Sequence, residues 1–282
     1  MIRTLDASML NLPHSLRELA PLCRQYGIQA ISATGEILDD EKAAAEAAAV
    51  MQENGLLWGL MPMPADFYHW ELDDEQFEQA LKVLERRAVV AEKLGVKHAY
   101  NHVWSSSPRP FDENFEWHIR RVAAVSDILS AHGVHYGLEF LGPHELRGWQ
   151  PYEFVHSLSG VLALADAAGG KAGIAFDTFH WYTSGNGCMD DVLLMQQHPE
   201  RLVALHMNDA VAGVTFDKQQ DMQRRLPMET GVIDSRDILR RFEATGSNAL
   251  YMIEPFEPSR TLFNKMTADE AVRTAAEIFA RL

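Results

Sequence analysis

Residues 172–183 read AGIAFDTFHWYT, and this stretch decides how the rest of the chain is interpreted. The apolar run at residues 173–176 has the length and composition of a strand that is buried on both faces. Asp177 follows the run directly, and His180 comes three residues later. Because an acid and a histidine are unusual at the end of a plain core strand, the stretch predicts a strand that carries functional side chains at its carboxyl end.

Three further apolar runs in the second half of the chain end in the same way. The runs YGLE, LVALH and LYMIE end at Glu139, His206 and Glu254, respectively. Together with the run that ends at Asp177, they are four consecutive predicted strands, each with one metal-compatible side chain at its end. Solvation or an ion pair would explain any one of these residues alone, whereas four at matching positions indicate a metal site.

Strand and helix signals alternate along the whole chain. Strands are predicted at residues 2–5, 28–32, 56–61, 96–100, 135–140, 173–176, 202–206 and 250–254. Helices are predicted at residues 13–26, 39–54, 73–94, 111–132, 151–168, 190–197 and 235–245, with a last helix after the capping box at 267–270. Eight strand-then-helix units without a linker predict one α/β domain over residues 1–282, a single (β/α)8 TIM barrel. A doubly wound sheet would carry a glycine-rich first turn, which the sequence lacks.

Glu139, Asp177, His206 and Glu254 form an oxygen-rich set at the end of the barrel where catalytic side chains lie. Three carboxylates and one imidazole suit one divalent ion, such as Mn²⁺, Mg²⁺, Co²⁺ or Zn²⁺, and the absence of thiolates argues against a structural zinc site. Three carboxylates around one divalent ion leave about one negative charge, so an anionic substrate group would need a nearby cation.

The composition is that of a soluble globular protein. With 282 residues, the chain is close to the length of about 250 that one barrel requires. The net charge of −15 argues against a nucleic-acid partner. Two cysteines are too few for a disulfide framework, and the sequence contains neither a signal peptide nor an apolar run of membrane-spanning length. We therefore expect a cytoplasmic enzyme with no membrane partner, and self-association into a homo-oligomer is left open.

The motifs around the four residues resemble the xylose-isomerase-like superfamily of TIM barrels, which has sugar phosphate isomerase/epimerase-type members. It includes tagatose 3-epimerases, inosose isomerases and dehydratases, and apurinic-site endonucleases. The metal ligands of the superfamily are matched by Glu139 in GLEF, Asp177 in FDTFH, His206 in LHMND and Glu254 in IEPF. The resemblance covers essentially the whole chain and is greatest to the inosose (2-keto-myo-inositol) isomerases, through GLEFLG, AFDTFHWYTSG, LHMND, TGVID and TADEAVRTAAE. It implies one bound divalent ion, with Mn²⁺ favoured.

The resemblance also implies an isomerase or epimerase whose substrate is a small carbohydrate, a keto-sugar or keto-inositol. A divalent ion would chelate the substrate carbonyl and the adjacent hydroxyl, and would stabilise the enediolate that forms when the α-proton is removed. Glu139 and Glu254 come from strands on opposite sides of the ion, so one would remove the proton and the other would return it.

Four further residues are predicted to contact the substrate. In similar enzymes a histidine at the position of His180 holds a substrate oxygen near the ion, and Arg224 would hold a hydroxyl or the enolate. His102 and Arg147 fall in loops after the fourth and fifth predicted strands, on the face where a barrel forms its site. Relatives have a Pro-Gly pair after the arginine, but Met228 replaces the glycine here, so the identity of the substrate stays open.

Three other functions are compatible with the same fold. A lyase would remove the same α-proton and then eliminate a β-substituent of a 3-oxo-glycoside, as in C-glycoside deglycosidases that resemble this superfamily. An abasic-site endonuclease would use His69 and His102 as further ligands, but it also needs an Asp-Arg-His group where this loop reads MQRRL. A metal-binding member without activity is disfavoured because all four ligand positions are filled.

Overall fold

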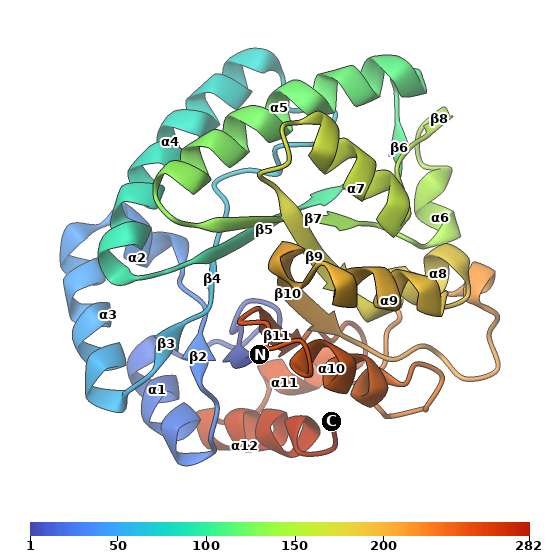
Figure 1. Ribbon diagram of the computed structural model, residues 1–282. Coiled ribbons are helices and arrows are strands. Elements are labelled where there is room, and N and C mark those ends of the chain that lie inside the picture. Colours follow the sequence, from blue (N-terminus) through green and yellow to red (C-terminus); the bar gives the residue numbers. More distant parts are fainter.

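A barrel of parallel strands lies at the centre of the molecule, and helices surround it (Figure 1). The structure, a computed structural model, describes residues 1–282. Neighbouring strands follow the order β3-β2-β1-β11-β10-β9-β7-β5-β4, and every pairing in this sheet is parallel. The strands are β1 (Ile2–Leu5), β2 (Ala30–Ile31), β3 (Leu57–Trp58), β4 (Leu60–Met61), β5 (His98–Val103), β7 (His135–Phe140), β9 (Gly173–Asp177), β10 (Leu202–Met207) and β11 (Leu250–Ile253).

The two ends of the sheet belong to one predicted strand, which closes the barrel. Only Gly59 separates β3 from β4, so the nine strands occupy eight positions, as the sequence predicts. The Gly59 N–H donates to the Ile31 carbonyl at 2.8 Å. A side chain at Gly59 would approach Thr4 Cγ2 to 2.6 Å and Ser32 Oγ to 2.9 Å. Glycine is therefore required where the strand breaks, because neighbouring strands leave no space for a Cβ atom.

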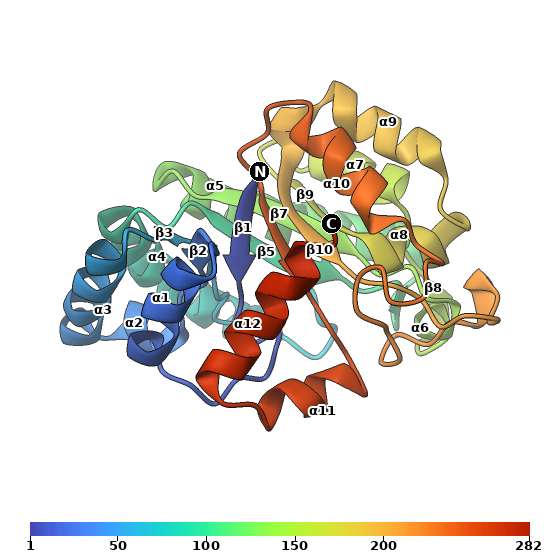
Figure 2. The same cartoon turned by 90° about the horizontal axis from the view of Figure 1, so that it is seen from below.

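Helices follow the strands and cover the outside of the barrel (Figures 1 and 2). They are α1 (Leu16–Gln25), α2 (Gly35–Asp39), α3 (Glu41–Asn54), α4 (Asp74–Leu94), α5 (Phe111–Ala131), α6 (His144–Arg147), α7 (Leu158–Ala167), α8 (Thr178–Gly185), α9 (Met189–Gln197), α10 (Ser235–Glu243), α11 (Ser259–Asn264) and α12 (Ala268–Phe279). Thr267 and Glu270 form the predicted capping box of α12. Among these helices, none combines the length and the apolar character needed to cross a membrane.

The helix predicted at residues 151–168 starts later than expected. Tyr152 and Glu153 instead form β8, which pairs antiparallel with β6 (Ser106–Ser107). Helix α7 begins only after Ser157, whose hydroxyl accepts a hydrogen bond from a backbone N–H of the first turn. A serine N-cap therefore sets the start of this helix, rather than the proline that precedes β8.

Other segments that the sequence predicts as loops have regular structure. Strand β5 continues to Val103 and so contains His102, residues 144–147 form α6, and α8 starts directly after Asp177 and contains His180. Helices α2 and α11 are not predicted either. All four helices are too short to show a hydrophobic period, and such short helices depend on tertiary packing.

Two apolar layers support the barrel. The larger contains 63 buried residues between the strands and the helices, and the smaller contains six residues inside the barrel, among them Ala175 and Ala204. Side chains two residues apart on a strand lie on the same face. Ala175 and Ala204 therefore lie one layer beneath Asp177 and His206, and the inner apolar layer forms a floor under the carboxyl ends of these strands.

A buried histidine on α5 makes the fold sensitive to acid. His118 Nδ1 hydrogen-bonds to the Asn114 carbonyl at 2.8 Å, its ring packs on Tyr68 and Phe154, and burial lowers its pKa to about 3. Below a pH of about 6.5 the His118 side chain becomes protonated in the unfolded chain but not in the folded protein. The free energy of unfolding therefore decreases as the pH falls. At pH 5 we expect a loss of about 2 kcal/mol from this residue relative to pH 7.5.

Urea unfolding of wild type and His118→Phe at both pH values tests this expectation. The variant starts from a lower stability at pH 7.5, because the hydrogen bond to Asn114 is lost, but should show a smaller decrease at pH 5. An equal decrease in the two proteins would assign the acid sensitivity to other groups.

Candidate metal centre

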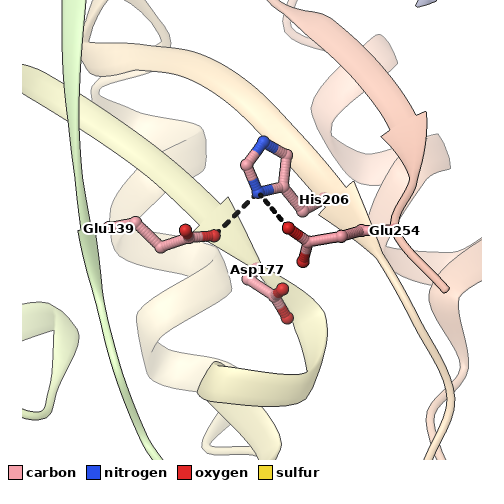
Figure 3. A group of neighbouring side chains, drawn as sticks. All are labelled: Glu139, Asp177, His206 and Glu254. Atoms are coloured by element: carbon pink, nitrogen blue, oxygen red, sulfur yellow. Dashed lines mark hydrogen bonds and ion pairs between the residues drawn. The ribbon is translucent and has the colours of Figure 1, made fainter. Parts of the chain in front are cut away.

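The four predicted ligands converge at the carboxyl ends of four adjacent strands (Figure 3). Glu139 lies in β7, Asp177 ends β9, His206 lies in β10, and Glu254 follows β11 directly. The register places Asp177 opposite His206. All four residues are buried, and one ligand atom from each lies within 4.8 Å of the others. Parallel strands of matching register thus bring residues far apart in the sequence into one space.

Glu139 lies between two imidazoles. Its Oε1 atom is 2.7 Å from His206 Nδ1, and its Oε2 atom is 3.0 Å from His102 Nε2. Burial opposes ionisation of Glu139, but the two imidazoles outweigh this effect and hold its pKa well below the usual value. Burial also works against charge on the imidazoles, yet Glu139 raises the pKa values of His206 and His102 to about 9. The negative charge on Glu139 therefore stabilises a positive charge placed next to it.

The arrangement fits one divalent ion. Two ligand atoms that each lie about 2.1 Å from an ion are at most about 4.2 Å apart, so this cluster needs only small side-chain movements to close around one. His206 Nδ1 is directed at the carboxylates of Glu139 and Glu254 (Figure 3). Glu139 Oε2 is buried and accepts no hydrogen bond of normal geometry, which leaves it available as a ligand. Three carboxylates and an imidazole are donors that Mn²⁺, Mg²⁺, Co²⁺ and Zn²⁺ accept.

The Asp177 carboxylate is held by hydrogen bonds to both oxygens. Oδ1 accepts from the backbone N–H groups of Phe179 and His180 at 2.6 and 3.1 Å, as the N-cap of α8. Oδ2 accepts from Arg224 at 2.7 Å and from Asn208 Nδ2 at 3.1 Å. Burial would raise the pKa of Asp177, but Arg224 and His180 together outweigh burial and lower it. Such contacts fix the orientation of a ligand before an ion binds.

Arg224 is buried beside the predicted ligands. Its Nη1 atom lies 2.7 Å from both Asp177 Oδ2 and Glu254 Oε2, and its Nη2 atom lies 2.7 Å from Asp221. The guanidinium group also lies over the ring of Phe256, with 4.2 Å to the ring centre. Burial raises the pKa of Glu254 to about 8 despite the arginine. Arg224 and one divalent ion together would balance the three carboxylates of the cluster.

His180 lies next to Arg224, so the structure brings two of the predicted substrate-binding residues together. His180 Nε2 is 3.2 Å from Arg224 Nη2, and His180 Nδ1 accepts a hydrogen bond of 3.3 Å from the Gly142 N–H. Burial lowers the pKa of His180. Both ring nitrogens face a donor, and a neutral ring accepts through only one nitrogen, so it takes a hydrogen bond either from the Gly142 N–H or from Arg224, not from both.

Gly142 permits the close approach of β7 to α8, and Gly142→Ala is expected to destabilise the protein. The added Cβ atom would overlap the His180 carbonyl oxygen and lie 2.6 Å from Thr183 Oγ1. Overpacking of this kind costs about 1–3 kcal/mol. Urea unfolding measures the loss, and Gly148→Ala is a matched control because a Cβ at Gly148 would meet nothing within 4 Å. Equal stability of both variants would contradict the tight contact.

The other two predicted substrate residues lie in different surroundings. The His102 side chain is 39% exposed at the mouth of the barrel while its Nε2 reaches the cluster. The Arg147 guanidinium donates to the backbone carbonyls of Gly142, Thr183 and Ser184, at 2.7, 3.3 and 3.3 Å. These hydrogen bonds join the segment after β7 to α8, and none of them reaches the four ligands.

Asp209 is a residue whose part in the site the sequence analysis missed. It is fully buried at the start of the long segment between β10 and α10. Its carboxylate accepts hydrogen bonds of 2.8–2.9 Å from four backbone N–H groups, those of Ala210, Thr230, Gly231 and Ile233. The backbone N–H of Asp209 donates to the carbonyl of Arg225, the residue after Arg224, and the N–H of Arg225 donates to the carbonyl of Asp209. Asp209 therefore holds together the two ends of the loop that carries Arg224. Its place in the LHMND motif is the only sequence signal for this role.

Asp209→Asn should loosen this loop. An amide group presents only one oxygen to the four N–H donors, and losing hydrogen bonds to a charged group costs about 1.5–3 kcal/mol. We expect trypsin to cut after Arg224 and Arg225 at least about ten times faster than in wild type. Asp217→Asn, in the same loop but with its side chain at the surface, is the control. Cleavage of Asp209→Asn at the wild-type rate would show that the loop is held by other contacts.

The chain has clear similarities to known proteins. Residues 20–282 match the family described as xylose isomerase-like TIM barrel. A xylose isomerase domain protein from Alicyclobacillus acidocaldarius is 25% identical with a TM-score of 0.82, and the match covers 100% of this chain and 97% of that one. The IolI protein, solved with a bound zinc atom, is 19% identical with a TM-score of 0.79 and the same coverage of 100% and 97%.

A more distant structure has a sugar bound. D-psicose 3-epimerase from Clostridium cellulolyticum H10, solved with D-tagatose, is 14% identical with a TM-score of 0.72, and the match covers 100% of this chain and 98% of that one. At these identities the IolI and epimerase structures establish a shared fold. No curated protein sequence matches the chain significantly.

Proposed function

The chain belongs to the xylose isomerase-like TIM barrel family, and we propose that it is a divalent-metal-dependent isomerase or epimerase of a keto-sugar or keto-inositol. The observation that carries this proposal is the position of Glu139 and Glu254. They approach His206 Nδ1 from β7 and β11, at 2.7 and 4.0 Å (Figure 3). Two carboxylates on different sides of one buried space suit the removal of a proton and its return.

The ion would be held by Glu139, Asp177, His206 and Glu254. When bound, it supplies a Lewis acid that polarises the substrate carbonyl and so makes the neighbouring carbon more acidic. We propose Mn²⁺ as the ion, with zinc as an alternative because the similar IolI structure contains it.

Proton transfer is the task of the two glutamates. One carboxylate removes the proton from the carbon beside the carbonyl, and its oxygen holds that proton at the face of the substrate on which it lies. A proton that the second carboxylate already carries is then given from the other face and inverts the carbon, which is epimerisation. Return of the proton to the former carbonyl carbon, with transfer of the neighbouring hydroxyl proton to the former carbonyl oxygen, instead moves the carbonyl along the chain, which is isomerisation.

His180 and Arg224 would orient the substrate. The two side chains lie 3.2 Å apart beside the cluster, and both carry N–H groups that suit carbonyl and hydroxyl oxygens. Arg224 is fixed by Asp221 and Glu254, so it needs little ordering when the substrate arrives. A small carbohydrate substrate is supported by the family and by the D-tagatose in the similar epimerase structure.

Solvent deuterium exchange tests the proposed function. Mn²⁺-loaded protein in D₂O is incubated with ketohexoses, 2-keto-myo-inositol and 3-keto-glucosides, and NMR follows the protons next to each carbonyl. We expect deuterium at that position in at least one compound, together with its epimer or isomer. Exchange followed by loss of a β-substituent would point to the lyase reaction instead. Absence of exchange in every compound, with the metal shown to be bound, would contradict the proposal.

A further inference from the structure

A second cavity lies beside the metal centre, in the half of the barrel mouth that carries no metal ligand. It has a volume of about 330 Å³ and is formed at the carboxyl ends of β1, β2, β4 and β5. The four metal ligands come from β7, β9, β10 and the end of β11, and none of them lines this cavity. The cavity is therefore separate from the region that the ion and the reacting carbons would occupy.

Apolar atoms form most of the surface of the cavity, and six of its 15 lining residues have thioether or aliphatic side chains. These six are Ala7, Met9, Ala33, Leu60, Met61 and Met63, of which Met61 is only 1% exposed and packs in the outer apolar layer. Met9 and Leu60 also belong to the apolar layer inside the barrel, so the floor of the cavity is apolar. Methionine is flexible and polarisable, which allows it to fit varied apolar groups and to contact aromatic rings.

Most polar groups around the cavity already have partners in the protein. Ser32 Oγ accepts from the Leu60 N–H, and Thr34 Oγ1 caps α2. Asn101 donates to the Ala65 carbonyl and accepts from the Tyr136 hydroxyl. The acceptor oxygens of these groups are therefore occupied, and the hydrogen bonds left for a bound molecule come mainly from uncharged hydroxyl groups.

No lysine or arginine lines the cavity. His102 is the one basic side chain in the lining, and its Nε2 atom is 3.0 Å from the Glu139 carboxylate. Arg87 lies behind Gly35 but is held by both oxygens of Asp39, at 2.6 and 2.7 Å. An anionic group in the cavity would find no free cation to balance it, and it would face the acid Asp6.

The cavity and the metal centre share a wall. His102 lines the cavity and contacts Glu139, and the Tyr100 ring lies against both His102 and His206, with ring centres 5.4 and 4.7 Å apart. His102 and Tyr100 therefore lie between the cavity and the predicted ligands Glu139 and His206.

We propose that this cavity binds an uncharged, apolar substituent of the substrate, such as the alkyl or aryl group of a keto-glycoside. An apolar cavity of about 150 Å³ holds one benzene molecule, so about 330 Å³ accepts an aryl group together with the atoms that link it to the sugar. The inference rests on the proposed function for the keto unit at the ion, but the nature of the cavity's ligand follows from its own lining. It excludes substrates with a phosphate or carboxylate on this side.

Methyl NMR tests the proposal without any turnover. The protein has 12 methionines, and [¹³C-methyl]methionine labelling gives each a separate signal that Met→Leu variants assign. The Mn²⁺-free protein is titrated with phenyl β-D-glucoside, glucose and glucose 6-phosphate. We expect phenyl β-D-glucoside to shift the signals of Met9 and Met63, with an affinity at least tenfold above that of glucose. The phosphate ester should bind no better than glucose.

A second test places a negative charge in the cavity and compares it with the same substitution outside the cavity. Met63→Glu should weaken binding of phenyl β-D-glucoside at least tenfold, whereas Met189→Glu, on the outer helix α9, should leave it unchanged. Equal affinity for glucose and phenyl β-D-glucoside, shifts confined to other methionines, or tightest binding of glucose 6-phosphate would each overturn the proposal.

The two proposals fail separately. If phenyl β-D-glucoside binds in the cavity but no keto compound exchanges deuterium, the proposed reaction is wrong and the cavity's ligand class stands. If exchange occurs with small ketoses but the methionine signals do not respond, the reaction stands and the cavity proposal is wrong.

Discussion

Glu254→Gln is expected to keep its metal and to lose solvent deuterium exchange by about 10²- to 10⁴-fold. The amide has nearly the shape of the carboxylate and retains one oxygen for the ion, but it cannot take up a proton from carbon. Glu254 meets Arg224 at 2.7 Å through Oε2, so with the amide oxygen turned to the ion the variant loses this contact, while Arg224 keeps its contacts with Asp177 and Asp221. The change therefore separates proton transfer from the structure of the site.

Metal content and exchange are measured on the same preparation. Glu277→Gln, at the surface of α12, is the matched control and should exchange at the wild-type rate. Glu139→Gln is expected to lose exchange as well, and to release the pairing with His206 and His102. Full exchange by metal-loaded Glu254→Gln would contradict the assignment of Glu254 as one of the two proton carriers.

His206→Ala is expected to lower the affinity for Mn²⁺ by at least about 100-fold, because loss of a supporting contact alone costs about 10- to 100-fold. His206 is the single nitrogen ligand of the cluster and is fully buried. At an ion concentration 100 times the dissociation constant, binding stabilises the wild type by about 2.7 kcal/mol, and this gain should disappear in the variant.

Calorimetric titration with Mn²⁺ and thermal unfolding with and without the ion measure both effects. His198→Ala is the control, since His198 is 53% exposed and pairs only with Glu200. An unchanged Mn²⁺ affinity in His206→Ala, together with a wild-type response in the control, would show that the ion binds at another position.

The strand ends of the site are predictable because local sequence determines them. Strand β7 has the predicted bounds, and Asp177 and His206 lie at the ends of β9 and β10. A strand buried on both faces is a continuous apolar run, so the first polar residue after it marks its carboxyl end. Parallel strands in register then bring these ends together without any information from the loops.

The surroundings of the four residues are not predictable in the same way. Arg224 lies in a loop without periodicity, and its contacts with Asp177, Glu254 and Asp221 join segments of the chain that only the fold brings together. The sequence predicts Arg147 in a loop as a substrate contact, whereas Arg147 ends the short helix α6 and donates to backbone carbonyls. Such contacts depend on side-chain direction, which neither spacing nor composition encodes.

The measurement that tests the central claim most directly is deuterium exchange during titration of metal-free protein with Mn²⁺. The keto compound that exchanges fastest in the panel is used as the substrate, and the exchange rate is recorded after each addition. If Glu139, Asp177, His206 and Glu254 hold one ion that is required for proton transfer, the rate rises from near zero and levels off at one ion per chain. An exchange rate that is independent of the ion, or one that levels off only after two or more ions per chain, would contradict a single-ion centre.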